Sequence, residues 1–283
     1  MNLHDILVWS AGLAGCGEIP ADSEVYLEAP GDVIRVLFGI DVDVGELLYG
    51  RDAGFDAVIA HHPLGGSART DFARVVHRQV DQMVAAGIAR HVAEKAVAQR
   101  LDRPHRADHM HNVNRIVDTG RLIGLPFANI HLACDIIGRQ KIVDLLTERD
   151  TGAPLVTDAL AWLDHFAEIR RGLTRPEVWV GEAGNPLGRW VVAMAGGTNG
   201  GYPVFREYWK AGVDTIFAMH CAEDDLQRLR AEAPPKKSLV VTGHMATDSI
   251  GINVVIAGME ERGVEVTRTS GIVAPGPVRP PAG

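Results

Sequence analysis

The chain has 283 residues, enough for one large core or two ordinary domains, and its 46% hydrophobic and 23% charged residues are typical of a globular protein. Its formal net charge of -8 argues against a dedicated nucleic-acid-binding surface, which needs a basic face. No apolar run reaches the ~18–20 residues that cross a bilayer. The three cysteines are scattered and form no C-x-x-C pair, which indicates neither a disulfide framework nor a thiolate metal site and favours a reducing cytoplasm.

The strongest structural pattern is an internal repeat. Residues 53–62 align without gaps with residues 211–220; half of the positions are identical, and most of the others exchange one apolar residue for another. Each copy follows an apolar run, at 33–40 and at 190–195, and then a stretch of helical character. The Ala-Gly pair at the start of each copy provides the left-handed turn that ends the preceding helix. The pattern predicts a right-handed βαβ unit in each half of the chain, and therefore two related lobes.

The rest of the chain predicts further elements of the same kind. Short apolar runs at 126–130 and 238–242 predict buried strands, and residues 69–115 keep the apolar spacing of helices. We therefore expect an α/β fold with two related lobes and mainly parallel sheets. The expected divisions are a first lobe over 1–150 with a helical insert at about 69–115, a second lobe over 151–235, a returning segment over 236–273 and a disordered tail over 274–283.

Four of the predicted strands run into histidine. His61 and His62 follow the first of them, and His131, His220 and His244 follow the others. A single histidine at such a place is more simply a half-buried ring at the start of a loop. Four strand ends with histidine, in a chain with only 12 histidines, are poorly explained by chance. Because ligands bind beyond the carboxyl ends of strands in parallel sheets, we expect a functional site there.

Carboxylates complete the pattern. Both His131–Asp135 and His244–Asp248 place an aspartate four residues after the histidine. If a helix begins after each strand, the two side chains lie on one helix face, within reach of one ion. Capping of the helix is the alternative role for Asp248, but the repeated spacing favours a metal. Neighbouring histidines on an extended chain point to opposite sides, so the His-His pair of the first strand more readily serves two ions than chelates one. Imidazole and carboxylate without thiolate suit Zn, Mn, Fe, Ni or Co.

Three motifs resemble those of the Nif-three-like dinuclear-metal-centre family, which is also described as GTP cyclohydrolase I type 2-like. They are residues 55–64, with the His-His-Pro sequence, the glycine-rich residues 195–200, and residues 243–248, with the Gly-His sequence. The resemblance runs from about Asp32 to Val266, with a break in the middle. It implies a metal site between two α/β lobes, commonly in a ring-shaped hexamer. The ligands that it implies are His61, His62, Asp135, His244 and Asp248, with His131 close by.

The chain departs from the family pattern in three places. Asp248 stands where the family usually has glutamate, which is one methylene longer. The N-terminal Asp-Asn-x-Gly-Leu element of the family is absent, and residues 22–26 are at best a remnant of it. A longer segment than usual separates His62 from Asp135. The last two departures affect the expected substrate more than the expected metal binding.

Two other motifs have more than one interpretation. The glycine-rich residues 195–201 lie between a strand and a helix, where backbone amides hold phosphate, although close packing of the turn explains the glycines equally well. Residues 105–111 carry three histidines and an arginine, and their i, i+4 histidine pair is a candidate metal ligand pair. The surrounding arginines favour a solvated surface helix instead; a basic flap that attracts an anionic substrate is the third interpretation.

These observations lead to two functional hypotheses. The first is metal-assisted hydrolysis of a small anionic molecule, with two divalent ions bridged by Asp135 that activate a shared water. His131 or His220 would serve as general acid or base, and the resemblance suggests a nucleotide or another phosphorylated or heterocyclic substrate. The second is a non-catalytic metal-binding scaffold or regulatory interaction protein. An open coordination position favours the enzyme, and a saturated shell favours the scaffold.

Overall fold

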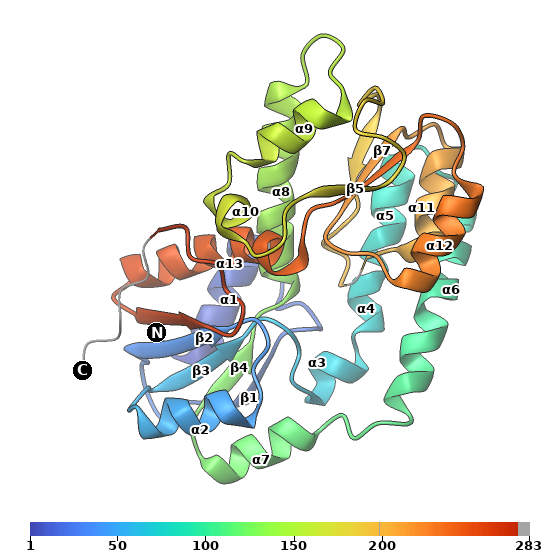
Figure 1. Cartoon of the computed structure of the whole chain (residues 1–283). Coiled ribbons are helices and arrows are strands. Elements are labelled where there is room, and N and C mark those ends of the chain that lie inside the picture. The colour runs from blue at the N-terminus through green and yellow to red at the C-terminus, as the bar shows by residue number, and fades with distance from the viewer. Residues whose placement is uncertain (198, 277–283) are drawn as a thin grey trace. The chain divides into compact units, whose positions relative to one another are not determined.

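Figure 1 shows the computed structural model of the chain, which describes residues 1–197 and 199–276, apart from the side chains of residues 100, 102–105, 107 and 108. The predicted tail from residue 277 on, Thr198 of the glycine-rich segment, and the side chains of His105 and Asp108 therefore lie outside the described residues. The chain forms two compact units. Unit 1 contains Met1–Val75, Asp108–Gly138 and the residues from Asp248 on, and unit 2 contains Val76–Ala107 and Arg139–Thr247.

Unit 1 is built on a five-stranded sheet with the order β1-β4-β3-β2-β9. The strands are β1 (Glu24–Leu27), β2 (Arg35–Gly39), β3 (Ala57–Ala60), β4 (Phe127–Asn129) and β9 (Glu265–Thr269). All neighbouring strands are parallel except β1 and β4, which pair antiparallel at one edge. The blue β2 and the red β9 lie side by side in Figure 1, although they come from opposite ends of the chain.

Unit 2 repeats this arrangement. Its four-stranded sheet has the order β5-β8-β7-β6, with β5 (Glu177–Val180), β6 (Trp190–Val192), β7 (Thr215–Ala218) and β8 (Ser238–Val241). The edge strand β5 is antiparallel to β8, and the other pairs are parallel. Strand by strand, this order matches β1-β4-β3-β2 of unit 1. The predicted α/β fold with two related units and mainly parallel sheets is confirmed.

Local sequence explains the two βαβ units. Helix α2 (Val44–Asp52) joins β2 to β3 and begins with a capping box, in which Asp43 and Glu46 each accept a backbone N–H at the helix start. Helix α11 (Gly201–Lys210) joins β6 to β7 in the same way. Every residue of β3 and of β7 is buried, as expected for parallel strands without a solvent-facing side.

The core of unit 1 positions the two strands that end in histidine. Leu47 of α2 and Val117 of α7 (Arg115–Ile123) pack with Val58 of β3 and Phe127 of β4 in one buried cluster. Helix α7 comes close to the sheet at Gly120, where a Cβ atom would lie only 2.6 Å from the Phe127 ring. Burial of these side chains therefore fixes β3 and β4 relative to each other.

The remaining helices are mostly short. They are α1 (Leu3–Leu13), α3 (Gly66–Thr70), α4 (Ala73–Val76), α5 (Arg78–Ala85), α6 (Arg90–Asp108), α8 (Leu132–Arg149), α9 (Val156–Leu163), α10 (Ala167–Arg171), α12 (Glu223–Glu232) and α13 (His244–Glu261). Helix α8 starts in unit 1 and continues in unit 2, whereas α13 starts in unit 2 and continues in unit 1. None of the described helices combines the length and apolar character that crossing a membrane requires.

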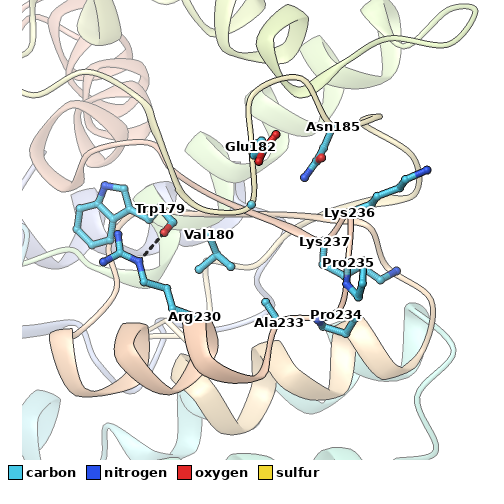
Figure 2. A pocket seen from close by; sticks show the side chains of 11 residues that line it. Trp179, Val180, Glu182, Asn185, Arg230, Ala233, Pro234, Pro235, Lys236 and Lys237 are labelled. Atoms are coloured by element: carbon cyan, nitrogen blue, oxygen red, sulfur yellow. Dashed lines mark hydrogen bonds between the residues drawn. The ribbon is translucent and has the colours of Figure 1, made fainter.

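Unit 2 has a surface pocket of about 360 Å³ beside its edge strand β5 (Figure 2). Its lining includes Trp179, Arg230, Lys236 and Lys237. The Arg230 side chain donates a hydrogen bond to the Trp179 carbonyl at 2.9 Å, and Lys237 forms an ion pair with Asp214 at 2.8 Å. The Arg230 and Lys237 side chains are thus engaged by the fold itself, and none of the predicted metal ligands lines the pocket.

Candidate metal centre

The first histidine of the candidate site follows β3 and is completely buried. The backbone N–H of His61 continues the sheet by donating to the Gly39 carbonyl at 2.8 Å. Its ring Nδ1 lies 3.0 Å from the Ile130 carbonyl oxygen, which can only accept, so Nδ1 carries the proton. Its Nε2 then points inward, 3.3 Å from Oδ1 of Asp135 and 3.8 Å from Oδ2 of Asp248.

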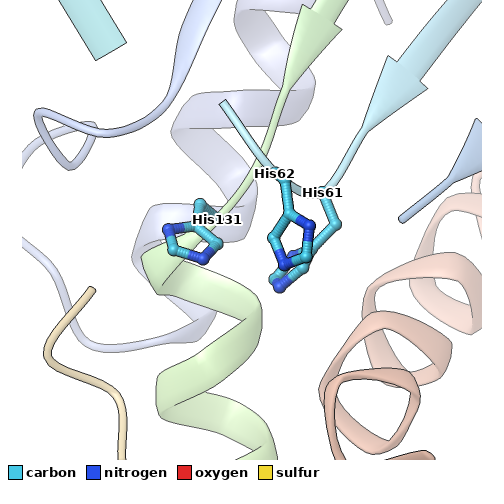
Figure 3. A group of neighbouring side chains, drawn as sticks. All are labelled: His61, His62 and His131. Carbon is cyan, nitrogen blue, oxygen red and sulfur yellow. The ribbon is translucent and has the colours of Figure 1, made fainter. Parts of the chain in front are cut away.

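Two further histidines of unit 1, His62 and His131, have the same arrangement. Nδ1 of His62 lies 2.7 Å from Asp41, and its Nε2 lies 3.6 Å from Oδ2 of Asp248. Nδ1 of His131, after β4, lies 2.7 Å from Asp22, and its Nε2 lies 3.8 Å from Oδ2 of Asp135. Figure 3 shows the three rings side by side, and their centroids are 4.8–5.6 Å apart.

Each of these three imidazoles thus donates a hydrogen bond from Nδ1 to an acceptor outside the cluster, and its Nε2 faces the carboxylate of Asp135 or Asp248. Metal-ligating histidines in proteins share this arrangement, because the outer hydrogen bond fixes the tautomer and the direction of the ring. Packing alone does not explain why all three rings have Nδ1 on the outside of the cluster and Nε2 on the inside.

A close contact between two helices brings the carboxylates together. Asp135 lies in the first turn of α8, and Asp248 lies one turn into α13. Gly251 of α13 packs directly on α8, where a Cβ atom would be only 1.9 Å from the Cys134 carbonyl oxygen. Only glycine permits this approach. Asp248 is the fifth residue of its helix, beyond the capping positions, and its carboxylate faces imidazoles.

The structure brings five of the seven predicted site residues together in unit 1. These are His61, His62, His131, Asp135 and Asp248. His244 is the first residue of α13, the helix that carries Asp248. It belongs to unit 2, where the centroid of its ring lies 4.4 Å from that of the His220 ring. The side chain of the buried Asn199 donates from Nδ2 to the His220 carbonyl at 2.9 Å, and the same Nδ2 lies 2.5 Å from Nδ1 of the His220 ring. The predicted roles of His244 as a metal ligand and of His220 as a general acid or base stay predictions.

The neighbouring carboxylates raise the pKa values of two cluster histidines, His131 and His62. Burial lowers the pKa of His131, but Asp135 and Asp22 outweigh burial and raise this pKa to about 9. Burial likewise lowers the pKa of His62, but Asp248 outweighs it, so the net shift is upward. The thiol of Cys134 has a pKa well above its usual value, chiefly because it is buried and also because Asp135 is near, so it is a neutral packing group rather than a thiolate ligand.

These residues fit a divalent cation. Nε2 of His61 and Oδ1 of Asp135 are buried and have no hydrogen-bond partner among the described residues, although they face each other. A buried lone pair and a buried carboxylate oxygen cost free energy unless a cation or a proton lies between them. Among the described residues of unit 1, two groups of three have ligand atoms within 4.8 Å of one another: His61/His62/His131 and His61/Asp135/Asp248. Nitrogen and oxygen donors of this kind suit borderline divalent metals.

Two acidic residues of the site were not identified from the sequence. Asp41 follows β2, so the same strand-end pattern that singled out the histidines would have found it. Asp22 gives no such signal, because it precedes the edge strand β1 and lies 109 positions away from the histidine that it contacts.

Comparisons with known proteins place this geometry in context. No family model and no curated protein matches the chain. Among solved structures, a NIF3 superfamily protein from Sphaerobacter thermophilus is 38% identical, with a TM-score of 0.90, and the match covers 96% of this chain and 98% of that one. A Bacillus cereus protein related to NIF3 (9% identity, TM-score 0.51) and a hypothetical protein from Staphylococcus aureus (11%, 0.52) share the fold, each match covering 95% of this chain and 96% of that one.

Proposed function

This chain belongs to the NIF3 superfamily, and from this membership and the buried His/Asp cluster we propose that it binds two divalent metal ions. The ligands in this proposal are His61, His62, Asp135, His244 and Asp248. The observation that carries it is the common polarity of the cluster imidazoles, whose Nδ1 atoms are held from outside while their Nε2 atoms face buried carboxylates. His244 enters the ligand set through α13, one helical turn before Asp248.

The reaction that we propose is hydrolysis of an anionic small molecule, with a nucleotide or another phosphorylated or heterocyclic compound as the substrate class. When bound, the divalent ions supply an activated water and a Lewis acid for the electrophile. His131 would move a proton at Nε2, because its Nδ1 is committed to Asp22. The exposure of His62 supports the idea that a substrate reaches the site from its side. Its side chain is 25% exposed, while those of His61, Asp135 and Asp248 are 7% exposed or less.

A metal-binding scaffold is the second candidate. The near-complete burial of three of the proposed ligands favours it, because structural metal sites are closed and saturated. The two candidates differ in whether an exchangeable water remains in the metal shell. X-ray absorption of the loaded protein, together with a hydrolysis assay over a panel of nucleotides, separates them. Turnover that disappears with the metal supports the hydrolase, and a saturated shell without turnover supports the scaffold.

Metal binding itself is tested by substitution. The double variant His61→Ala/His62→Ala removes two Nε2 donors and should lose most of its metal, whereas the purified parent should carry close to two ions per chain. The matched control is His4→Ala/His165→Ala, which removes two exposed histidines outside the cluster and should keep the metal content of the parent. Elemental analysis is the measurement. Unchanged metal in the His61/His62 variant would contradict the site.

A further inference from the structure

The segment from Asp22 to Tyr26 contacts both strand ends that carry the cluster histidines. The Asp22 carboxylate is completely buried. One of its oxygens lies 2.7 Å from Nδ1 of His131, and the other accepts the backbone N–H of Leu132 at 3.4 Å. Next to it, Ser23 accepts the backbone N–H of His131 at 3.0 Å. The start of α8 is therefore held by two consecutive residues of this segment.

The same segment reaches the other strand end through Asn129. The Asn129 amide donates to the Asp22 carbonyl at 2.7 Å and, more weakly, to the His61 carbonyl at 3.4 Å. The Tyr26 hydroxyl donates to the Asn129 side-chain oxygen at 2.7 Å and accepts the backbone N–H of Leu64 at 3.0 Å. Residues 22–26, at best a remnant of a family motif by sequence, form the outer frame of the cluster.

Asp22 determines which nitrogen of His131 is available. A carboxylate can only accept a hydrogen bond, so Nδ1 of His131 keeps its proton and donates it to Asp22. The electron pair of the neutral ring is then at Nε2, on the side of Asp135. The Phe72 ring stacks on His131 with the centroids 6.0 Å apart and limits its tilt. The arrangement resembles the carboxylate–histidine pairs that orient metal ligands and general bases.

We propose that Asp22 is a positioning residue of the metal centre: it fixes the Nδ1-protonated form and the direction of His131, so that Nε2 joins the five proposed ligands and presents its electron pair to an ion instead of transferring a proton. This inference rests on the proposed metal-binding function. Asp22→Asn keeps the size of the side chain but cannot accept from both His131 and Leu132, because one of its two ends is a donor. If the amide faces the ring, Nδ1 must accept, and the proton moves to Nε2.

The first test uses nitrogen NMR of the histidine rings. In the metal-free parent at a pH above about 9, where the His131 ring is neutral, correlation of each ring proton with its own nitrogen and carbon should assign a slowly exchanging, low-field N–H to Nδ1 of His131. In the zinc-loaded parent, His131 should remain Nδ1-protonated. Asp22→Asn should lose the low-field proton. A metal-free parent whose His131 carries no such protected Nδ1 proton would overturn the proposal without any variant.

The second test measures metal affinity by competition of Co²⁺ with a chelator. Asp22→Asn should weaken binding about 10–100-fold, which is the usual effect of losing the outer partner of a metal-site histidine, and should alter the visible Co²⁺ spectrum. The control is Ser23→Ala, which removes a hydrogen bond of the same segment but leaves the His131 ring untouched. It should lower only the thermal stability of the metal-free protein. Equal affinities and spectra for Asp22→Asn and Ser23→Ala would reduce Asp22 to a structural role.

The two tests distinguish failure of this inference from failure of the proposed function. If the parent binds no divalent ion, the proposed function is wrong, but the metal-free NMR experiment still decides whether Asp22 orients His131. If the parent binds two ions and Asp22→Asn binds them unchanged with the same His131 tautomer, the metal site stands and the positioning role is wrong.

Discussion

The acceptors behind the three cluster histidines differ in chemistry, and this difference sets how strongly each ring is held. His61 relies on a neutral backbone carbonyl, which no side-chain substitution can remove. The carboxylate behind His62 belongs to Asp41, whose side chain is 69% exposed, so solvent weakens this charge–ring interaction. The carboxylate behind His131 belongs to the completely buried Asp22, where the same interaction is stronger. Among the three rings, His131 should therefore depend most on its outer partner.

The residue that departs from the family pattern, Asp248, provides a prediction on metal affinity. Its Oδ2 lies within 3.8 Å of Nε2 of both His61 and His62, so it faces the ion positions although it is shorter than glutamate. We expect it to bind one ion through one oxygen, with water in the remaining position. Asp248→Glu should keep or raise metal affinity, and Asp248→Ala should lower it by about 10–100-fold or more. Metal titration of both variants is the measurement, and parental affinity in Asp248→Ala would remove Asp248 from the ligand set.

A second residue-scale prediction concerns the pH dependence of the metal-free protein. The folded-state pKa of His131 is raised from 6.5 to about 9, so the protonated ring stabilises the fold. This contribution is complete below pH 6.5 and is lost as the pH rises through about 9; by linkage it is on the order of 3 kcal/mol. In chelator, the free energy of unfolding should fall over this range. The His131→Gln variant should show a clearly flatter profile, and parallel profiles would contradict the assignment.

At the scale of elements, the crossing of α8 and α13 within unit 1 decides the site. Each helix contributes one aspartate to the cluster, and only their contact at Gly251 places the two carboxylates around the same imidazole. The crossing tolerates no side chain, because Gly251 would meet the Cys134 carbonyl and the Gly138 backbone N–H. The geometry of the cluster therefore depends on a residue that carries no donor group.

This dependence predicts the effect of Gly251→Ala. The added methyl group must push the helices apart, which should destabilise the protein by about 1–3 kcal/mol or more and weaken metal binding as Asp135 and Asp248 separate. The control is Gly12→Ala in α1, where a Cβ atom meets nothing within 4 Å and the better helix propensity should leave stability unchanged or raise it by up to about 1 kcal/mol. Denaturant unfolding and metal titration measure both effects. Equal behaviour of the two variants would rule out the close helix contact.

At the scale of the whole molecule, the repeat extends beyond the ten residues that are visible in the sequence. The two sheets share a strand order, and each has an antiparallel edge strand with an irregular register, at Val25/Leu27 and at Val178/Val180. By this correspondence, His220 after β7 matches the histidine pair after β3, and His244 after β8 matches His131 after β4. The histidines of the cluster and the His220/His244 pair therefore follow corresponding strands of the two sheets.

The family resemblance predicts the assembly state. The resemblance implies a ring of six subunits, and soluble homo-oligomers generally close by symmetry. We therefore expect a closed oligomer in solution, most simply a hexamer. Light scattering coupled to size exclusion at micromolar protein concentration measures the mass directly, with the metal-depleted protein run beside the loaded one. A monomer in both states would contradict the expectation.

The parts of this protein that depend on local pattern could be predicted from its sequence. Continuous apolar runs identified β2, β3, β4, β6, β7 and β8, helical spacing identified the crossovers, and histidines directly after strands identified the donors now found in the cluster. The edge strands β1, β5 and β9 were not predicted, because their residues alternate irregularly between buried and partly exposed instead of forming a continuous apolar run. Such strands take their conformation from the neighbour with which they pair rather than from their own composition.

How the metal-donor side chains are held depends on contacts between segments that are distant in the sequence. The contact of Asp22 with His131 joins residues 109 positions apart, and that of Gly251 with Cys134 joins the starts of two distant helices. Neither pair has a local signature, since an aspartate before an edge strand and a glycine within a helix are each compatible with many environments. The order of the strands brings these segments together, and the orientation of every ring in the cluster follows from it.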